Sequence, residues 1–138
     1  MAVTEIEIRD FSISETAALT GVSVHTLRYY ERAGLMRDVV PRAASTHRRY
    51  RADDIGWVQF ITRLRSTGMS IQQIRQYADM ARAGDISEEQ RLILLETHKE
   101  RVEEQLREVQ QHLAAITFKI DLYRERIAQR NGQNGAST

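Results

Sequence analysis

The apolar residues in the last third of the chain recur at alternating intervals of three and four positions. Eleven positions from Leu92 to Ile127 keep this spacing without a break, and Lys99 is the one polar residue among them. A 3,4 repeat sustained over several heptads is typical of a coiled-coil seam, in which the a and d residues face a partner helix. The pattern predicts a dimerisation helix over residues 87–130. Its expected seam residues are Leu92, Leu95, Val102, Leu106, Val109, Leu113, Ile116, Ile120, Tyr123 and Ile127.

Such a helix exposes a continuous apolar face to water unless a partner covers it. A second copy of the chain is the simplest partner, so a homodimer is expected. The alternative is a helix that folds back on its own domain, although docking faces on globular domains normally follow a period of 3.6 rather than 3.5 residues. The charged residues beside the seam favour neither a parallel nor an antiparallel pairing.

Two short helical patterns lie near the start of the chain, separated by about three residues. Ser14 is expected to cap the first helix, which Gly21 ends, and Ser23 is expected to cap the second. Two short helices joined by a glycine-containing turn are typical of a helix-turn-helix, which the pattern predicts over residues 14–33.

A stretch without helical period follows over residues 39–51, and its polar, basic end favours a short β-hairpin. A second helix pair is predicted over residues 53–84, with Asp53 or Asp54 at its start and Ser70 as the cap of its second helix. The expected fold class is therefore mainly α.

The two ends of the chain, residues 1–11 and 131–138, have no sustained period and are predicted to be disordered. No apolar run approaches the roughly 20 residues that a membrane-spanning helix needs, and no signal-peptide pattern opens the chain. These patterns predict a cytoplasmic protein that has no membrane partner.

Basic residues are concentrated in one part of the chain. The 138 residues include 20 Lys and Arg and 19 Asp and Glu, but between Arg28 and Arg65 nine Arg stand against four acidic residues. Because Arg makes bidentate contacts with phosphate groups and guanine edges, this segment favours a nucleic-acid partner. A solvated charged surface is the alternative that composition leaves open.

The chemistry available to the chain is limited by what it lacks. It has no cysteine, which excludes disulfides and thiolate metal sites. His98 and His112 are separated by about 21 Å along one predicted helix, too far to share a metal. We expect no metal and no cofactor. Glycine-rich phosphate loops, zinc-protease motifs and nucleophile elbows are missing from the sequence, so the chain is not expected to be an enzyme.

The second helix of the predicted helix-turn-helix carries candidate DNA contacts. His25, Arg28, Tyr29 and Arg32 lie at i, i+3, i+4 and i+7, which places them on one helix face. Arg can pair with guanine or phosphate and a Tyr hydroxyl can reach phosphate, as a helix in the major groove requires. An ordinary solvated helix face is the alternative.

Two further basic elements accompany this helix. Arg48, Arg49 and Tyr50 lie at the end of the predicted hairpin, which could serve as a wing along the DNA backbone or minor groove. Arg63 and Arg65, near the end of the third helix, are candidate phosphate clamps, with solvation as the alternative.

Three segments together resemble the MerR family of bacterial transcription regulators. They are T-L-R-Y-Y-E-R-A-G-L at Thr26–Leu35, H-R-R-Y at His47–Tyr50 and R-L-R-S-T-G-M-S-I-Q-Q-I at Arg63–Ile74. The resemblance implies a winged helix-turn-helix DNA-binding domain over residues 12–84, followed by an antiparallel coiled-coil homodimer. It also implies binding to a pseudo-palindromic promoter operator, distortion of that DNA so that RNA polymerase can engage the promoter, and a location on the bacterial nucleoid.

The resemblance also implies residue roles. Arg28 and Tyr29 would contact a groove or the backbone, Tyr30 would contact the backbone or brace the helix, and Arg65 would clamp a phosphate. The full set of expected DNA-binding residues is His25, Thr26, Arg28, Tyr29, Tyr30, Arg48, Arg49, Tyr50 and Arg65.

The sequence departs from the family pattern where an effector would bind. Eleven residues remain after Ile127, so no separate effector domain is expected. A small apolar effector could bind among Trp57, Tyr77, Phe118 and Tyr123, although these aromatics could instead simply fill a junction between helices. A different class of function also remains open, namely a coiled-coil adaptor whose basic domain docks an acidic protein partner.

Overall fold

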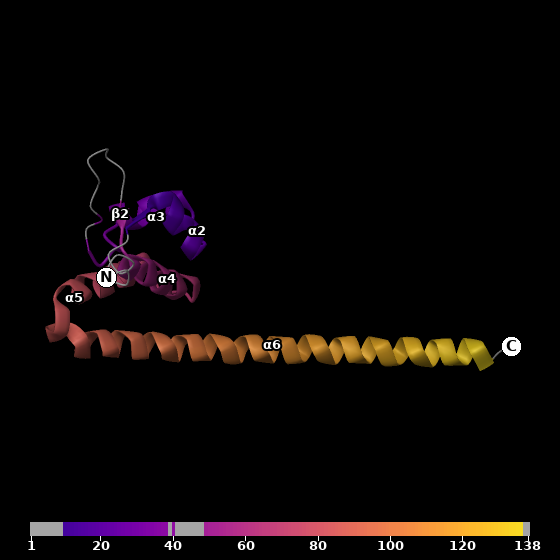
Figure 1. The fold of residues 1–138 in the computed structure, drawn as a ribbon. Coiled ribbons are helices and arrows are strands. Elements are labelled where there is room, and N and C mark those ends of the chain that lie inside the picture. The colour runs from indigo at the N-terminus through magenta and orange to yellow at the C-terminus, as the bar shows by residue number, and fades with distance from the viewer. Residues whose placement is uncertain (1–9, 39, 41–48, 137–138) are drawn as a thin grey trace, which may run out of the picture. The chain divides into compact units, whose positions relative to one another are not determined.

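The computed structural model describes residues 10–38, 40 and 49–136 of the chain. It divides into two compact units, Met1–His98 and Lys99–Thr138. Along the chain the elements are β1 (Phe11–Ser12), α2 (Ile13–Thr20), α3 (Val24–Arg32), β2 (Arg49–Tyr50), α4 (Ala52–Ser66), α5 (Ile71–Arg82), the 3₁₀-helix η1 (Gly84–Ser87) and α6 (Glu88–Ala136) (Figure 1).

The helix-turn-helix consists of α2 and α3, but its first cap differs from the prediction. The Ser12 hydroxyl accepts a hydrogen bond from the Glu15 N–H at 3.1 Å, and the Glu15 carboxylate accepts one from the Ser12 N–H at 3.0 Å. Ser12, and not Ser14, is therefore the N-cap, because only Ser12 has an acidic residue three positions later to complete a capping box. Ser23 caps α3 as predicted, and its hydroxyl accepts from the Thr26 N–H at 3.1 Å.

A two-stranded antiparallel sheet joins the start of the first unit to the residues before α4. Phe11 of β1 lies opposite Tyr50 of β2, and Ser12 lies opposite Arg49. The prediction of disorder over residues 1–11 is therefore wrong for Phe11, because a strand of two residues is too short to produce an alternating pattern. Most of the predicted hairpin, residues 39 and 41–48, lies outside the described residues.

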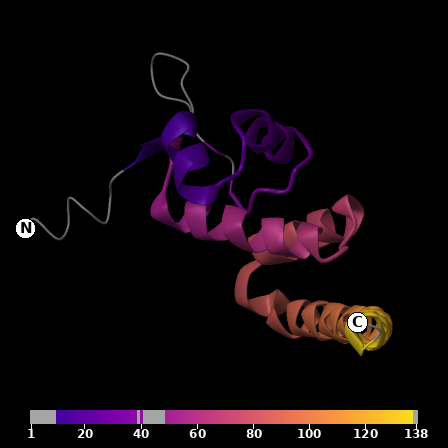
Figure 2. The ribbon, with the colours of Figure 1, turned by 90° about the vertical axis from the view of Figure 1, so that its right-hand side faces the viewer.

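The core of the first unit is centred on α4. Both α2 and α3 lie on the same side of α4 (Figures 1 and 2). Val58, Ile61 and Leu64 of α4 are buried, as their spacing predicts, and so are Ile74, Tyr77 and Ala78 of α5. The apolar side chains with at most 1% exposure in this core are Leu27, Leu35, Tyr50, Val58, Ile61, Ile74 and Ala78. None of the helices in the described part of the chain has a stretch that is long and apolar enough to cross a bilayer.

The turn after α3 is closed by a glycine in the left-handed region. Gly34 has φ of 74°, which is favourable for a residue without Cβ. The Leu35 N–H then donates to the Tyr30 carbonyl oxygen at 3.0 Å, a bond that spans the end of the helix. As a result the Leu35 side chain turns back into the core, where it is fully buried.

The first residues of α6 belong to the core of the first unit. Leu94 and Leu95 pack against that core, and His98 Nε2 lies 2.8 Å from Thr67 Oγ1 at the end of α4. Leu95 is only partly buried by this contact, so its predicted contact with a partner helix stays a prediction. A heptad pattern reports only that a side chain faces apolar surroundings, and it does not say to which chain they belong.

Helix α6 also extends further than predicted. It continues to Ala136, so the prediction of disorder over residues 131–138 is wrong for residues 131–136. Adding residues to an existing helix is much easier than nucleating one, so a polar segment of weak helix propensity can extend a long helix. Residues 137–138 lie outside the described residues.

The first turn of α4 contains a buried carboxylate. Asp54 is 7% exposed, and its Oδ2 accepts a hydrogen bond from the Arg51 N–H at 2.9 Å. Burial raises the pKa of the Asp54 carboxyl, and the nearby charges of Asp38 and Asp53 act in the same direction, while the bond from Arg51 opposes them. The ionised form is therefore less favourable in the folded chain than in the unfolded chain.

Asp54→Asn should alter how thermal stability depends on pH. Asparagine can still accept the Arg51 N–H through its side-chain oxygen, but it carries no charge to be buried. Because the folded-state pKa is raised, the unfavourable ionisation develops as pH rises through the range in which the carboxyl titrates. We expect the melting temperature of the variant, relative to wild type at equal protomer concentration, to increase from pH 4 to pH 7. A relative melting temperature that falls over this range would contradict the raised pKa.

Candidate nucleic-acid interface

Helix α3 presents two different faces. Leu27 and Tyr30 are buried on one side, at 0% and 5% exposure. The opposite side consists of His25, Arg28, Tyr29 and Arg32, all exposed. The packing of the inner face thus fixes a basic and aromatic outer face toward solvent, as the helical spacing predicts.

Tyr30 and Thr26, which were predicted to contact DNA, form hydrogen bonds within the protein. The Tyr30 hydroxyl lies 3.1 Å from the Thr62 Oγ1, so Tyr30 braces α3 against α4, which is one of the two roles expected for it. Thr26 is partly buried, and its Oγ1 accepts a hydrogen bond from the Ser23 hydroxyl at 2.9 Å within the N-cap. Both side chains hold α3 in place.

The strand β2 does not present its residues as predicted. Tyr50 is 0% exposed, and its hydroxyl donates a hydrogen bond to the carboxylate of Glu31 on α3. Its prediction as a DNA contact is therefore wrong, because the ring fills the core while its polar group is bonded inside the protein. Arg49 is partly buried and Arg51 is exposed. Arg48 lies outside the described residues.

Arg63 and Arg65 are exposed in the last turn of α4. A guanidinium in this position interacts favourably with the partial negative charge at the C-terminus of a helix. The same exposed groups remain available to a phosphate, so their positions are compatible with both roles. A role in DNA binding stays a prediction for Arg65.

The four aromatic residues proposed for an effector belong to two separate units. In the first unit the rings of Trp57 and Tyr77 stack, with centroids 5.4 Å apart and an interplanar angle of 7°. In the second unit Phe118 and Tyr123 are 68% and 52% exposed. The stacked pair fills a junction between α4 and α5, which agrees with the alternative interpretation for these two residues, and the effector pocket stays a prediction.

Trp57 also borders a hollow of about 410 Å³ in the first unit. Phe60 forms a second aromatic wall, and the hollow carries three carboxylates and one guanidinium, from Asp38, Asp53, Asp54 and Arg37. Among the described residues, no three His, Asp or Glu side chains gather closely enough to hold a metal ion.

Comparison with known families identifies the chain. A profile described as "MerR HTH family regulatory protein" matches residues 11–81, which include the sheet, the helix-turn-helix and nearly all of α5. The chain belongs to the MerR family. A second family profile, "MerR, DNA binding", matches residues 55–117. The resemblance is thereby confirmed, and the chain is a DNA-binding transcriptional regulator.

Relatives of similar length support the family assignment. An uncharacterised helix-turn-helix regulator of Haemophilus influenzae is 30% identical over 83% of this chain and 84% of its own length. The uncharacterised regulator YyaN of Bacillus subtilis is 32% identical over 82% of this chain and 90% of its own length.

Solved structures share the fold. HiNmlR, described as a MerR family regulator lacking the sensor domain and bound to promoter DNA, has a TM-score of 0.78 at 30% identity, covering 87% of this chain and 94% of HiNmlR. A MerR family regulator from Listeria monocytogenes has a TM-score of 0.77 at 34% identity, covering 82% and 85% of the two chains.

Sequence reasoning missed two polar contacts that position this MerR-family interface. The bond between Tyr50 and Glu31 joins residues 19 positions apart, and Arg82 of α5 bonds to the segment after α3. Neither pair has a spacing that a helix or strand period would reveal. An apolar or polar pattern predicts which face is buried but not which distant group a buried polar atom meets.

Tyr50→Phe tests the internal role of this tyrosine. Loss of the hydroxyl that donates to the Glu31 carboxylate should lower the free energy of unfolding by about 1–3 kcal/mol, measured by denaturant titration at fixed protomer concentration. Tyr29→Phe is the matched control, because its exposed hydroxyl should change stability by less than about 0.5 kcal/mol. A Tyr50→Phe variant with wild-type stability but weaker DNA binding would restore the wing role.

Proposed function

We propose that the chain binds promoter DNA as a homodimer, with one α3 in the major groove of each half-site. The observation that carries this proposal is the exposed face of His25, Arg28, Tyr29 and Arg32, whose opposite helix face is fixed in the core. The likeness to HiNmlR, which was solved with promoter DNA, supports the same interpretation. In this proposal Arg28 would form a bidentate contact with guanine, and Arg65 would contact a phosphate.

The homodimer is supported by an apolar stripe on α6 that its own chain leaves uncovered. Seven seam positions between Leu106 and Ile127 are between 44% and 61% exposed. They extend over about 32 Å at 1.5 Å per residue. Monomeric soluble proteins rarely expose so long a contiguous apolar face. The antiparallel orientation is the one that the resemblance to the MerR family implies. The stripe consists of Leu106, Val109, Leu113, Ile116, Ile120, Tyr123 and Ile127.

The symmetry of such a dimer defines the DNA that it recognises. Two recognition helices related by a two-fold axis require two half-sites in inverted orientation, that is, a pseudo-palindromic operator. We infer that the dimer distorts this operator, using its contacts to offset the elastic energy of bending, and so controls how RNA polymerase engages the promoter. The protein would act on the bacterial nucleoid in the cytoplasm, with no catalytic step, metal or cofactor.

Footprinting on the DNA upstream of the protein's own coding region tests the proposal. We expect a protected, pseudo-palindromic stretch and salt-dependent binding that is at least about 1,000-fold tighter than binding to a scrambled duplex at the same salt. Equal affinity for the two duplexes would contradict sequence-specific binding and would favour an adaptor whose basic surface docks an acidic protein.

Arg28→Ala and Arg65→Ala should weaken binding in different ways. Loss of a base contact by Arg28→Ala should cost about 1–3 kcal/mol and relax the preference at particular base pairs. Loss of a phosphate contact by Arg65→Ala should weaken all sequences alike and reduce the slope of log K against log salt by about one unit. Fluorescence anisotropy with operator, point-substituted and scrambled duplexes at several salt concentrations measures both effects.

Arg107→Ala is the control for lost charge in this series. Arg107 is exposed at a b position of the heptad and pairs with Glu104, far along α6 from α3 in sequence. The Arg107→Ala variant should keep the wild-type DNA affinity, the wild-type base preference and the wild-type slope of log K against log salt. If Arg28→Ala and Arg65→Ala give the same base preference and the same slope, the division into base and phosphate contacts is wrong.

Leu106→Asp combined with Leu113→Asp should convert the dimer to monomers. Each substitution places a carboxylate in the dimer interface, where a charge without a partner is strongly unfavourable. Analytical ultracentrifugation at micromolar concentration measures the outcome. Phe118→Asp is the matched control, because Phe118 is 68% exposed at an f position outside the seam, and it should remain dimeric. Dimers of the double variant would contradict the proposed interface.

A further inference from the structure

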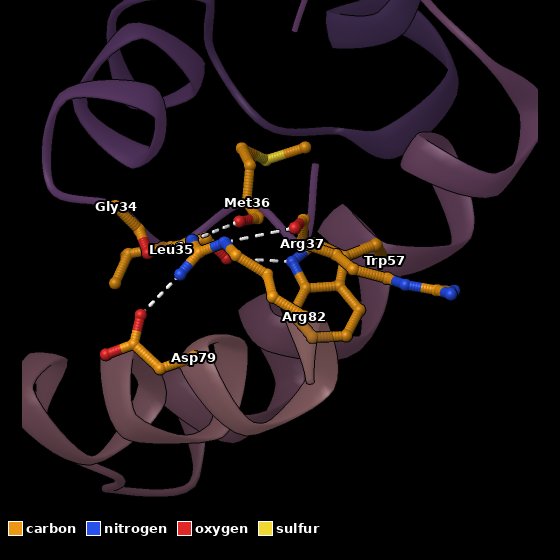
Figure 3. Close-up of polar contacts among 7 residues, drawn as sticks. All are labelled: Gly34, Leu35, Met36, Arg37, Trp57, Asp79 and Arg82. Carbon is orange, nitrogen blue, oxygen red and sulfur yellow. Dashed lines mark hydrogen bonds and ion pairs between the residues drawn. The ribbon is translucent and has the colours of Figure 1, made fainter. Parts of the chain in front are cut away.

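The last residue of α5, Arg82, reaches the segment that directly follows α3 (Figure 3). Its Nη2 donates to the carbonyl oxygen of Gly34 at 2.8 Å and to that of Met36 at 2.5 Å. Its Nε donates to the carbonyl oxygen of Arg37 at 3.1 Å. The remaining guanidinium nitrogen, Nη1, pairs with the carboxylate of Asp79, one turn earlier on α5. One side chain thus bonds three backbone carbonyls while an acidic neighbour orients it.

The remaining carbonyl of this segment, that of Leu35, accepts a hydrogen bond from a residue of α4. The Trp57 Nε1 donates to the Leu35 carbonyl oxygen at 2.8 Å, and the Trp57 ring stacks on Tyr77 of α5. Four consecutive carbonyls, those of residues 34–37, are therefore held by side chains from α4 and α5, as Figure 3 shows. We call Arg82, Trp57 and these four carbonyls the carbonyl clamp.

The two sides of the carbonyl clamp lie at functionally different places in the chain. Residues 34–37 form irregular backbone that starts just after α3, and they lead toward β2. Arg82 lies just before η1 and α6, where the Arg91 Nη2 donates to the Gly84 carbonyl oxygen at 3.0 Å and so ties α6 to the turn after α5. The carbonyl clamp joins the segment after α3 to the end of α5, and the Arg91 bond joins the turn after α5 to the start of α6, the helix with the proposed dimer seam.

We propose that Arg82, oriented by Asp79, is a positioning residue for operator recognition. It holds each recognition helix to the junction between α5 and α6 of its own protomer, and in this way it sets the separation of the two recognition helices in the dimer. The proposal rests on the proposed function, since it concerns a homodimer on two half-sites. The positioning role matters for a full operator, in which the two half-sites have a defined spacing. Binding to a single half-site does not require this role of Arg82.

The physical basis is the geometry of the guanidinium group. Its planar arrangement of N–H groups can meet several carbonyls in fixed directions, whereas the single ammonium of lysine cannot. Arg82 is also partly exposed, so it contributes less to the apolar core than Leu35 or Tyr50 do. Arg82→Lys should therefore preserve the charge that attracts DNA and the folded core, but release the segment of residues 34–37.

The test compares three duplexes with the full-length protein: an operator, a single half-site and an operator with one base pair inserted between its half-sites. Wild type should bind the operator much more tightly than the inserted operator, because half-site separation is fixed by the dimer. Arg82→Lys should lose about tenfold in operator affinity, and its discrimination against the inserted operator should shrink. Its affinity for the single half-site should stay within about twofold of wild type.

Two variants and one spectroscopic signal complete the design. Arg107→Lys, the same change at an exposed position of α6, should behave as wild type with all three duplexes. Trp57→Phe removes the donor to Leu35 while keeping an aromatic ring, and it should reduce spacing discrimination as Arg82→Lys does. Because Trp57 is the single tryptophan, its fluorescence emission reports the clamp, and in Arg82→Lys it should shift to longer wavelength as the indole gains contact with water.

The outcomes separate this proposal from the proposed function. If wild type itself does not prefer any operator, the proposed function fails. If wild type binds its operator and Arg82→Lys keeps wild-type discrimination and emission, the positioning role is wrong while the proposed function stands. If Arg82→Lys weakens the operator and the half-site equally at a temperature where circular dichroism shows it folded, Arg82 serves general stability and the positioning role is again wrong.

Discussion

The recognition helix depends on a single constraint, which is that a helix of nine residues is too short to be stable in water by itself. Its stability must come from its inner face, where Leu27 and Tyr30 are buried, and from its ends, where Ser23 caps the first turn and Gly34 closes the last. The same packing that makes the helix possible therefore determines which side chains face outward. The basic surface is a consequence of the core and cannot rotate independently of it.

Polar contacts then fix the direction of that surface more sharply than apolar packing can. Apolar contacts depend little on direction, whereas hydrogen bonds require particular angles. Tyr30 bonds to Thr62, Tyr50 bonds to Glu31, and the carbonyl clamp holds the segment after α3. The first two bonds join α3 to α4 and to β2, and the carbonyl clamp joins the segment after α3 to α4 and α5. Specific DNA recognition needs that accuracy, while attraction to phosphate needs only charge.

Much of this arrangement follows from the sequence, because periodicity and caps are local signals. The spacing of the apolar residues predicts the helices of the second pair, and Ser23 and Ser70 are the caps that the sequence indicates. The correct cap of α2 could also be predicted from the sequence, since Ser12 and Glu15 form a capping-box pattern. The burial of Tyr50 could not be predicted from local patterns, because it depends on the pairing of β2 with β1. The nearest paired residues of these strands, Ser12 and Arg49, are 37 positions apart in the sequence.

The two units differ in what holds them together, and this difference separates two properties of the regulator. The first unit has its own core, which includes Leu94 and Leu95 from the start of α6. Beyond Lys99 the seam side chains of α6 find no core within the described part of the second unit, and in the proposed dimer their burial depends on a partner. Stability that comes from association varies with protomer concentration, whereas stability from an internal core does not. The structure of the recognition surface is thus independent of concentration, and in the proposed dimer the pairing of two such surfaces on one operator is the step that responds to the amount of protein present.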